Sequence, residues 1–135
     1  MIGDRTAENI KIKIGEFYEH TAPKLLEARG RDLITGLPKT ITLSSKEMIG
    51  AMYEPMTELI DGICDVIEHT PPELVGDILH NGILMVGGGS LLQGLDKLIT
   101  RVTVIKTVRA KNPEACVCLG MAEKLKTISK IPSGK

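Results

Sequence analysis

The stretch Asn81-Gly-Ile-Leu-Met-Val-Gly-Gly-Gly-Ser-Leu-Leu92 decides the fold class of this 135-residue chain. Ile83 to Val86 is an uncharged apolar run, which is typical of a strand buried on both faces of a helix-covered sheet. Three glycines and Ser90 follow directly, and the leucines at 91, 92, 95 and 98 then have helical spacing. The order of buried strand, glycine turn and helix predicts an α/β or α+β fold.

The glycine turn has two interpretations that the residues leave open. Glycines let a backbone approach a ligand closely, and the N–H groups at a helix start favour anions such as phosphate. A tight strand-to-helix turn also needs glycine for its dihedral angles alone. No Gly-Lys-Ser/Thr sequence ends the turn as in a P-loop, and Leu92 occupies the third glycine position of a dinucleotide fingerprint.

Composition excludes several classes of function. The 17 basic residues balance 17 acidic ones, so the chain lacks the basic footprint of a nucleic-acid-binding protein. The sequence shows no signal peptide and no long apolar segment, which predicts a cytoplasmic chain without a membrane segment of its own. The three cysteines lack metal-pair or disulfide spacing and are expected to be small buried residues. They are Cys64, Cys116 and Cys118.

The first part of the chain predicts a short helix followed by a hairpin. The pattern predicts a helix from Asp4 to Ile14, with Asp4 or Thr6 as its cap. Glu8 and Lys11 are adjacent on one face of that helix. They are either a solvated ion pair or two groups that reach together for a sugar hydroxyl pair. A polar connector then leads into residues 24–43, which alternate around a turn at 33–38 and predict a β-hairpin.

A capping box, Ser44-Ser-Lys-Glu47, opens the longest predicted helix, which runs to Glu68 with Pro55 inside it. Thr70 is predicted to cap a second helix. A strand is expected over 102–108, and a last helix is expected to start at 112–114. The residues expected to face inward on the second and last helices are Leu74, Val75, Ile78, Leu79, Val117, Leu119, Ala122 and Leu125. Few strands are available for the sheet, so we expect an exposed apolar surface and a dimer or swapped assembly.

The chain resembles the MreB/Mbl rod-shape-determining proteins, the bacterial actins, along most of its length. The resemblance is carried by Gly3-Asp-Arg-Thr-Ala-Glu-Asn-Ile-Lys11, by Arg29-Gly-Arg-Asp-Leu-Ile-Thr-Gly-Leu-Pro-Lys-Thr40, by Thr70-Pro-Pro-Glu-Leu74, by Gly87-Gly-Gly-Ser-Leu-Leu-Gln-Gly-Leu-Asp96 and by Asn112-Pro113. It implies part of the second domain of an actin-like, ribonuclease H-like fold. Residues 1–13 and 70–128 would belong to the larger subdomain, 14–69 would form a small inserted α+β subdomain, and 129–135 a flexible tail.

The resemblance also implies a function and its site residues. Members of this family bind ATP with magnesium, polymerise into membrane-associated filaments, and determine rod shape by guiding cell-wall synthesis. The implied partners are the chain itself or a full-length homologue, and the cell-wall elongation machinery. The implied nucleotide-binding residues are Glu8, Asn9, Ile10 and Lys11 on the ribose and adenine side, and Gly87, Gly88, Gly89, Ser90 and Leu91 in the loop that closes over the nucleotide.

This sequence departs from the family pattern at several places. It lacks the two phosphate loops, the acidic residues that position magnesium, and the membrane-inserting segment, so we expect weak adenine-nucleotide binding and no catalytic or metal-binding residue. Val104-Ile-Lys106 stands where the family tends to have a Gly-x-Pro turn. Two alternatives remain: a stand-alone module that caps filaments of a homologue, and an actin-fold chain of the chaperone or cell-division type. The segment Arg29–Asp32 disfavours the second.

Overall fold

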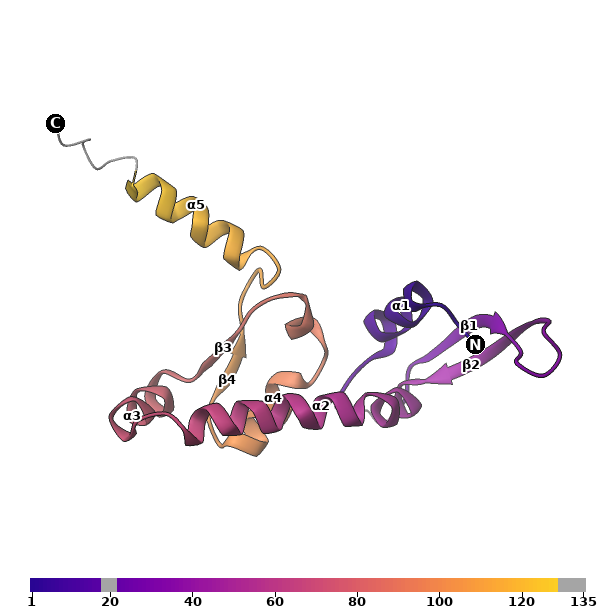
Figure 1. Ribbon diagram of the computed structural model, residues 1–135, viewed down its shortest axis with the longest axis horizontal. Helices are drawn as coiled ribbons and strands as arrows, with labels where there is room; N and C mark the ends of the chain where they lie inside the picture. Colours follow the sequence, from indigo (N-terminus) through magenta and orange to yellow (C-terminus); the bar gives the residue numbers. More distant parts are fainter. Residues whose placement is uncertain (18–21, 129–135) are drawn as a thin grey trace.

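The computed structural model describes residues 1–17 and 22–128. The expected connector at 16–24 lies partly outside the described residues, and the expected tail at 129–135 lies wholly outside them. Figure 1 shows the elements. They are α1 (Asp4–Ile14), β1 (Leu25–Arg31), β2 (Pro38–Ser44), α2 (Ser45–Glu68), α3 (Pro72–Asn81), β3 (Ile83–Met85), a 3-10 helix η1 (Gly88–Leu91), α4 (Leu95–Thr103), β4 (Thr107–Arg109) and α5 (Cys116–Ile128).

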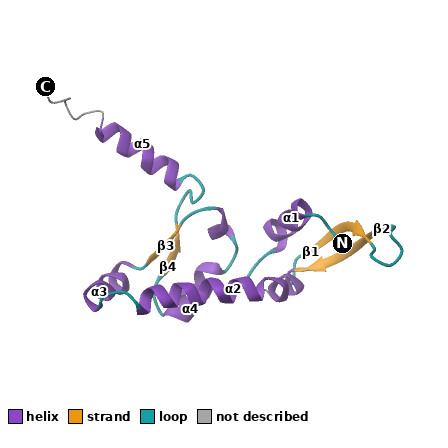
Figure 2. Ribbon diagram, in the orientation of Figure 1, coloured by secondary structure: helices purple, strands orange, loops and turns teal. Residues whose placement is uncertain are grey.

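The long helix α2 joins two parts of the molecule (Figures 1 and 2). At its N-terminal end lie α1 and the antiparallel hairpin of β1 and β2, and at its other end lie α3 and the parallel pair of β3 and β4. Each part has its own apolar core. We call Ile10, Ile14 and Ala28 the hairpin-side cluster, and Ile60, Met85, Leu95 and Ile99 the sheet-side cluster.

The hairpin forms as its alternating sequence predicts. Its turn is held by Asp32, whose carboxylate accepts hydrogen bonds from the backbone N–H groups of Ile34 and Thr35 at 2.9 and 3.1 Å. Lys39 pairs with the same carboxylate at 3.2 Å. The bonds from Thr35 and Ile34, and then the one from Lys39, hold the pKa of Asp32 below its ordinary value because each stabilises the ionised form. Pro38 begins β2, as expected of a residue without a ladder donor.

The predicted capping box is confirmed at the start of α2. The Ser44 hydroxyl accepts a hydrogen bond from the Glu47 backbone N–H at 3.3 Å, and the Glu47 carboxylate accepts one from the Ser44 N–H at 2.8 Å. The bonds that Ser44 donates lower the pKa of Glu47. The helix then runs to Glu68 as predicted, with Pro55 inside it. Met52 and Ile60, on its expected apolar stripe, are buried.

Two predicted helix caps are wrong. Gly3 rather than Asp4 or Thr6 precedes α1, and it makes no side-chain cap. Pro71 precedes α3, while the Thr70 hydroxyl donates backwards to the carbonyl of Val66 at 2.6 Å and so belongs to the end of α2. In both places a residue type that commonly caps helices lies within one to three positions of the true start, which is the usual error of boundary prediction.

The strand expected over 102–108 is present only as β4 at Thr107–Arg109, because α4 extends to Thr103. Val102 and Thr103, the first two residues of this stretch, lie in the helix. The Thr100 and Thr103 hydroxyls donate to the carbonyls of Asp96 and Ile99, each at 2.8 Å, which satisfies them inside the helix. Buried Leu95 and Ile99 anchor the helix on the core.

The expectation that the strand after Gly82 is buried on both faces is wrong for this chain. Met85 is buried, but Leu84 is 62% exposed and Val86 is 47% exposed. The cause is the expected shortage of strands: β3 pairs with β4 alone, in a two-stranded parallel sheet. The predicted exposed apolar surface is therefore present, while a dimer or swapped assembly stays a prediction.

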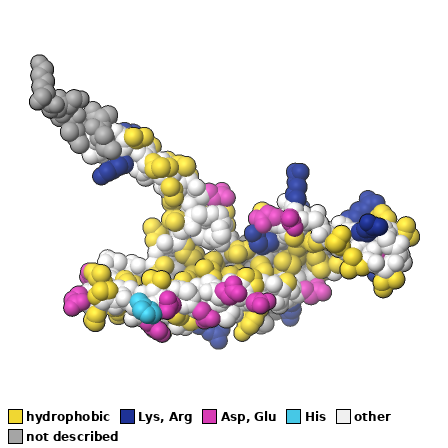
Figure 3. All heavy atoms as spheres, viewed as in Figure 1, with side chains coloured by type: hydrophobic (Ala, Val, Ile, Leu, Met, Phe, Trp, Pro, Cys, Tyr) yellow, Lys and Arg dark blue, Asp and Glu magenta, His cyan; other side chains and the backbone are white. Residues whose placement is uncertain are grey.

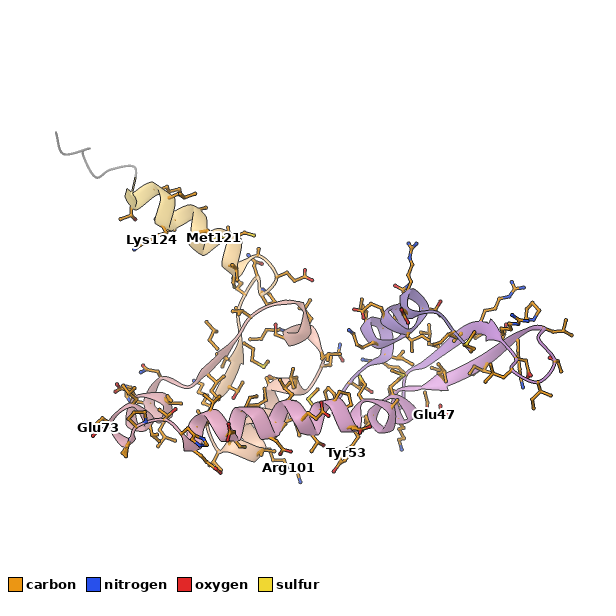
Figure 4. The ribbon with its side chains drawn as sticks, viewed as in Figure 1. Glu47, Tyr53, Glu73, Arg101, Met121 and Lys124 are labelled. Carbon is orange, nitrogen blue, oxygen red and sulfur yellow. The ribbon has the colours of Figure 1, made fainter. Side chains whose placement is uncertain are left out.

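The inward faces predicted for α3 and α5 are not buried either. Leu74 and Leu79 on α3 are exposed, and Val75 and Ile78 are only half-buried. On α5, the four residues expected to face inward are exposed. Figure 4 shows Met121 on this helix, which projects away from the rest of the chain (Figure 1). The buried-cysteine prediction fails for a related reason, since Cys118 on α5 is exposed and Cys64 and Cys116 are half-buried.

Candidate functional site

The ion pair predicted on α1 is formed, with the Lys11 ammonium 2.7 Å from the Glu8 carboxylate. Both side chains are about half exposed, at 41% and 56%. The helix that carries them is packed against the core, because Ile10 and Ile14 on another of its faces belong to the hairpin-side cluster. The pair is therefore held at a defined place while its charged ends stay accessible. The Glu8–Lys11 contact agrees with the interpretation as a solvated ion pair. A ligand could use the same two side chains only if they face a cavity.

The glycine turn follows β3 directly, and its conformation explains one of its three glycines. Gly87 has φ 82, a value that side-chain-bearing residues rarely adopt. Its backbone N–H donates to the Pro113 carbonyl at 2.7 Å, and its own carbonyl accepts the hydroxyl of buried Ser90 at 2.7 Å. A Cβ on Gly89 would meet no atom within 4 Å, and one on Gly88 would meet only a Glu114 carboxylate oxygen at 3.5 Å. Tight turn geometry thus requires Gly87, whereas Gly88 and Gly89 border open space.

The helix after the glycine turn begins later than the leucine spacing predicts. The turn leads into the short 3-10 helix η1, and α4 starts only at Leu95. Leu91 and Leu92, expected in the same helix as Leu95, lie in and just after η1. The glycines therefore lead into a short 3-10 helix, and the predicted α-helix begins only after them. What the turn offers a ligand is the exposed backbone of Gly88 and Gly89.

One cavity of about 330 Å³ brings the two predicted sites together. It is lined by the Glu8–Lys11 pair from α1 and by Gly88, Gly89 and Leu91 from the glycine turn, which lie far apart in the sequence. The remaining lining residues are Ile12, Lys13, Gly15, Lys24, Leu92, Gln93 and Glu114. The volume lies within the range of small-molecule sites in proteins.

Four of the nine predicted site residues lie outside this lining. Ile10 is 4% exposed in the hairpin-side cluster, where it supports α1 from the core. Asn9 is exposed on the same helix. Gly87 and Ser90 form the inner side of the turn and shape the loop that presents Gly88 and Gly89. Whether any of the nine contacts a nucleotide stays a prediction.

Sequence reasoning missed four polar residues of the cavity, Lys13 on α1 and three residues from loops. Lys24, Gln93 and Glu114 come from three separate loops and belong to no recognisable local pattern. Lys24 in turn contacts Glu16, whose side chain is 1% exposed and whose carboxylate is 2.9 Å from the Lys24 ammonium. A charged residue next to Phe17 and Gly15 gives no sequence signal of such deep burial, because charged side chains are almost always exposed.

The cavity offers a ligand both apolar and polar surface. Ile12, Leu91 and Leu92 provide aliphatic groups, and the glycine backbone allows a close approach. A carboxylate accepts hydrogen bonds from hydroxyls and an ammonium donates to oxygen. Within the described ranges, no group of three or more histidine, cysteine, aspartate or glutamate residues has the arrangement of a metal site. In the same ranges, no helix combines the length and hydropathy that crossing a bilayer requires.

Comparison with known proteins gives one consistent result. A family model described as MreB/Mbl protein matches residues 1–133. The chain is 41% identical over 132 residues to the cell shape-determining protein Mbl of Bacillus cereus, covering 98% of this chain and 40% of that protein. It is 40% identical over 128 residues to the cell shape-determining protein MreB of Escherichia coli K12, covering 95% of this chain and 37% of that protein.

Solved structures show the same similarity in three dimensions. MreB5 of Spiroplasma citri bound to ADP superposes with a TM-score of 0.92 at 36% identity, over 98% of this chain and 41% of that one. The same protein bound to AMPPNP gives a TM-score of 0.91, over 96% of this chain and 39% of that one. The fold is therefore actin-like and partial, as expected. The chain spans about two fifths of the length of the relatives that it matches.

Proposed function

Because this chain belongs to the MreB/Mbl family of cell shape-determining, actin-like proteins, we propose that it supplies one wall of an adenine-nucleotide site. One observation carries the proposal: the Glu8–Lys11 pair and the backbone of Gly88 and Gly89 face the same cavity. Two similar structures were solved with ADP and AMPPNP bound. A cavity with these groups suits a ligand that has an apolar ring at one end and hydroxyls at the other.

The chemistry of the lining suggests how each part of a nucleotide would be held. The adenine would lie against aliphatic side chains and glycine backbone, since no described aromatic residue lines the cavity. Glu8 would accept hydrogen bonds from the ribose hydroxyls, and Lys11 would donate to their oxygens. Lys13 supplies positive charge for the phosphate end, while the Lys24 ammonium is already paired with the buried Glu16 carboxylate. Without further phosphate contacts this wall alone should bind weakly, so the expected ligands are adenosine and ADP as well as ATP.

The test is calorimetric titration of the chain with ADP and with adenosine. The Glu8→Ala, Lys11→Ala double variant should weaken binding roughly tenfold or more, because hydrogen bonds to charged groups are among the strongest that proteins make. The matched control is Glu123→Ala, Lys126→Ala. It removes an ion pair of the same spacing on α5, outside the cavity, and leaves the net charge equally unchanged. Equal affinity in both double variants, or no binding by the folded parent chain, would contradict the proposal.

A second function, assembly into filaments, is favoured by the tip of the hairpin. Leu33, Ile34 and Leu37 are 78%, 96% and 65% exposed, and the Asp32 bonds hold the loop that presents them. A rigid loop with large apolar side chains in water indicates a contact surface. We propose that this tip joins the chain to the next subunit, either a second copy or a full-length homologue. Membrane association and contact with the cell-wall elongation machinery would follow from the assembled filament.

Co-sedimentation with filaments of a full-length MreB separates the two assembly hypotheses. Incorporation predicts that the chain enters the pellet in proportion to its concentration. Capping predicts that substoichiometric amounts reduce the pellet instead. A Leu37→Ser variant should lose either effect, whereas Leu125→Ser, which changes an equally exposed apolar residue on α5, should retain it. If the parent chain neither enters nor reduces the pellet, the filament proposal is wrong.

A further inference from the structure

Gln93 ties the two walls of the cavity together through both its backbone and its side chain. Its carbonyl accepts a hydrogen bond from the Phe17 N–H at 2.7 Å, and a parallel β-bridge joins it to Glu16 at the end of the α1 segment. Its side-chain Oε1 accepts a hydrogen bond from the Lys24 ammonium at 2.7 Å. Gln93 follows the glycine turn, so these bonds connect the wall formed by α1 to the wall formed by the turn.

Lys24 is fixed at both ends, which makes it a rigid part of this connection. Its backbone N–H donates to the hydroxyl of buried Ser45 at 3.2 Å, and the Ser45 N–H donates back to the Lys24 carbonyl at 2.9 Å. Its ammonium is held 2.9 Å from the Glu16 carboxylate, whose side chain is only 1% exposed. A carboxylate removed from water needs a paired cation, so the lysine side chain is pinned where Gln93 can meet it.

The same residues are part of the cavity. Lys24 and Gln93 both line it, beside Lys11 and Gly89. Gln93 accepts hydrogen bonds both from the Phe17 N–H, just after α1, and from the Lys24 ammonium. A change at Gln93 should therefore alter the separation of the walls without touching the Glu8–Lys11 pair.

We propose that Gln93, Lys24 and Glu16 form a clasp that sets the width of the cavity, with Gln93 as a positioning residue for the nucleotide. This inference rests on the proposed nucleotide site and identifies what holds that site ready. A ligand that touches both walls gains affinity when the walls already stand at the bound distance, since ordering them on binding costs free energy. Losing the clasp should therefore weaken every ligand that spans the walls, whether or not it carries phosphate.

The binding test compares two substitutions at one position. Gln93→Leu keeps the side-chain volume and the backbone bond to Phe17 but removes the oxygen that Lys24 meets. It should weaken adenosine and ADP alike, roughly fivefold or more, as expected for coupling between two walls. Gln93→Glu restores an acceptor for Lys24 and should restore adenosine binding, while its added charge disfavours ADP. The control is Asn81→Leu, which removes an exposed amide at the end of α3, outside the cavity lining. It should change neither the adenosine nor the ADP affinity.

A distance measurement tests the clasp without any nucleotide. Nitroxide labels on Lys13→Cys and Glu114→Cys, with the three native cysteines replaced by serine, report the separation of the walls, because both positions line the cavity. Gln93→Leu should broaden the distance distribution, and Gln93→Glu should narrow it again. A distribution that Gln93→Leu leaves unchanged overturns the clasp, even if that variant lowers the melting temperature. If the parent chain binds no adenosine, the nucleotide site fails, and the distances still decide the clasp.

Discussion

The two parts of the molecule at the ends of α2 differ in how much of their backbone and apolar surface this chain itself pairs and buries. On the hairpin side, seven-residue strands pair along their whole length, and the Asp32 and Ser44 side chains satisfy the turn and the helix start. On the sheet side, the strands are only three residues long, and apolar side chains of α3 and α5 stay exposed (Figure 3). Contacts between residues close in sequence complete the first part. The exposed apolar side chains over α5 and the sheet predict that the second part is covered by a partner.

The sharpest test of this difference is one large-to-small substitution on each side. Ile14→Ala, on the hairpin side, should cost about 2–5 kcal/mol of unfolding free energy, because it leaves a cavity in a closed core. Leu84→Ala, on the sheet side, should cost far less, since Leu84 is 62% exposed in this chain and Ile14 is 3% exposed. Urea denaturation of the two variants gives both values. Equal losses would mean that another part of the protein covers Leu84.

The exposed sheet face also predicts self-association. Leu84→Lys should weaken a dimer by about 1.5–3 kcal/mol, the value of burying one leucine side chain, which is roughly tenfold or more in the dissociation constant. Sedimentation equilibrium over a range of protein concentrations measures it. The control is Leu25→Lys on β1, where a similarly exposed leucine lies on the completed side. A chain that stays monomeric at high concentration, or a dimer that Leu25→Lys alone weakens, would show that the open face is not what associates.

A smaller effect is expected at the junction between α4 and β4. Val104 ends α4 with φ 59, the left-handed conformation that costs a side-chain-bearing residue roughly 1–2 kcal/mol. The side chain is 83% exposed and contributes little packing. Val104→Gly should therefore raise the unfolding free energy by about 1 kcal/mol.

The control for this substitution is Val102→Gly, inside α4. It should lower stability by up to about 1 kcal/mol, because glycine is less favourable than valine within a helix and the partly packed valine side chain is lost. Thermal unfolding of both variants distinguishes the positions. A loss of stability in Val104→Gly would mean that the valine side chain makes contacts worth more than the backbone strain.

What the sequence predicts well is local. The hairpin, the capping box and the long helix depend on residues within a few positions of one another, and all three are found where they are expected. The glycine turn and the Glu8–Lys11 pair are also recognisable one at a time, although their meeting in one cavity is a property of the fold.

What the sequence does not predict depends on neighbours it cannot specify. The alternation of 102–108 is a strand pattern, but Ile99 and Leu95 draw its first residues into a helix packed on the core. The apolar faces of α3 and α5 have a helical period that signals burial, and the described chain supplies no surface to bury them. Gln93 and Glu16 carry no motif, because their roles arise only when the two walls meet. The division into subdomains at 13–14 and 69–70 stays a prediction.

Acid should loosen the hairpin side before the sheet side, and by the smallest amount of the effects considered. Asp32 and Glu47 have pKa values lowered from ordinary values of 3.8 and 4.5 by hydrogen bonds to their ionised forms. A lowered folded pKa means that the unfolded chain binds more protons in this range. The carboxylates therefore stabilise the fold above their ordinary pKa values, and that contribution is lost as the pH falls through the folded ones. Glu47 is exposed and Asp32 is half-buried in a surface turn, so the effect is modest. NMR titration of the Ile34 and Thr35 amides should give a midpoint below 3.8, and Asp32→Asn should abolish that transition while Met85, on the sheet side, reports no change there. A midpoint at or above 3.8 would mean that the turn bonds do not favour the ionised carboxylate, and the hairpin side would then be completed by its strand pairing alone.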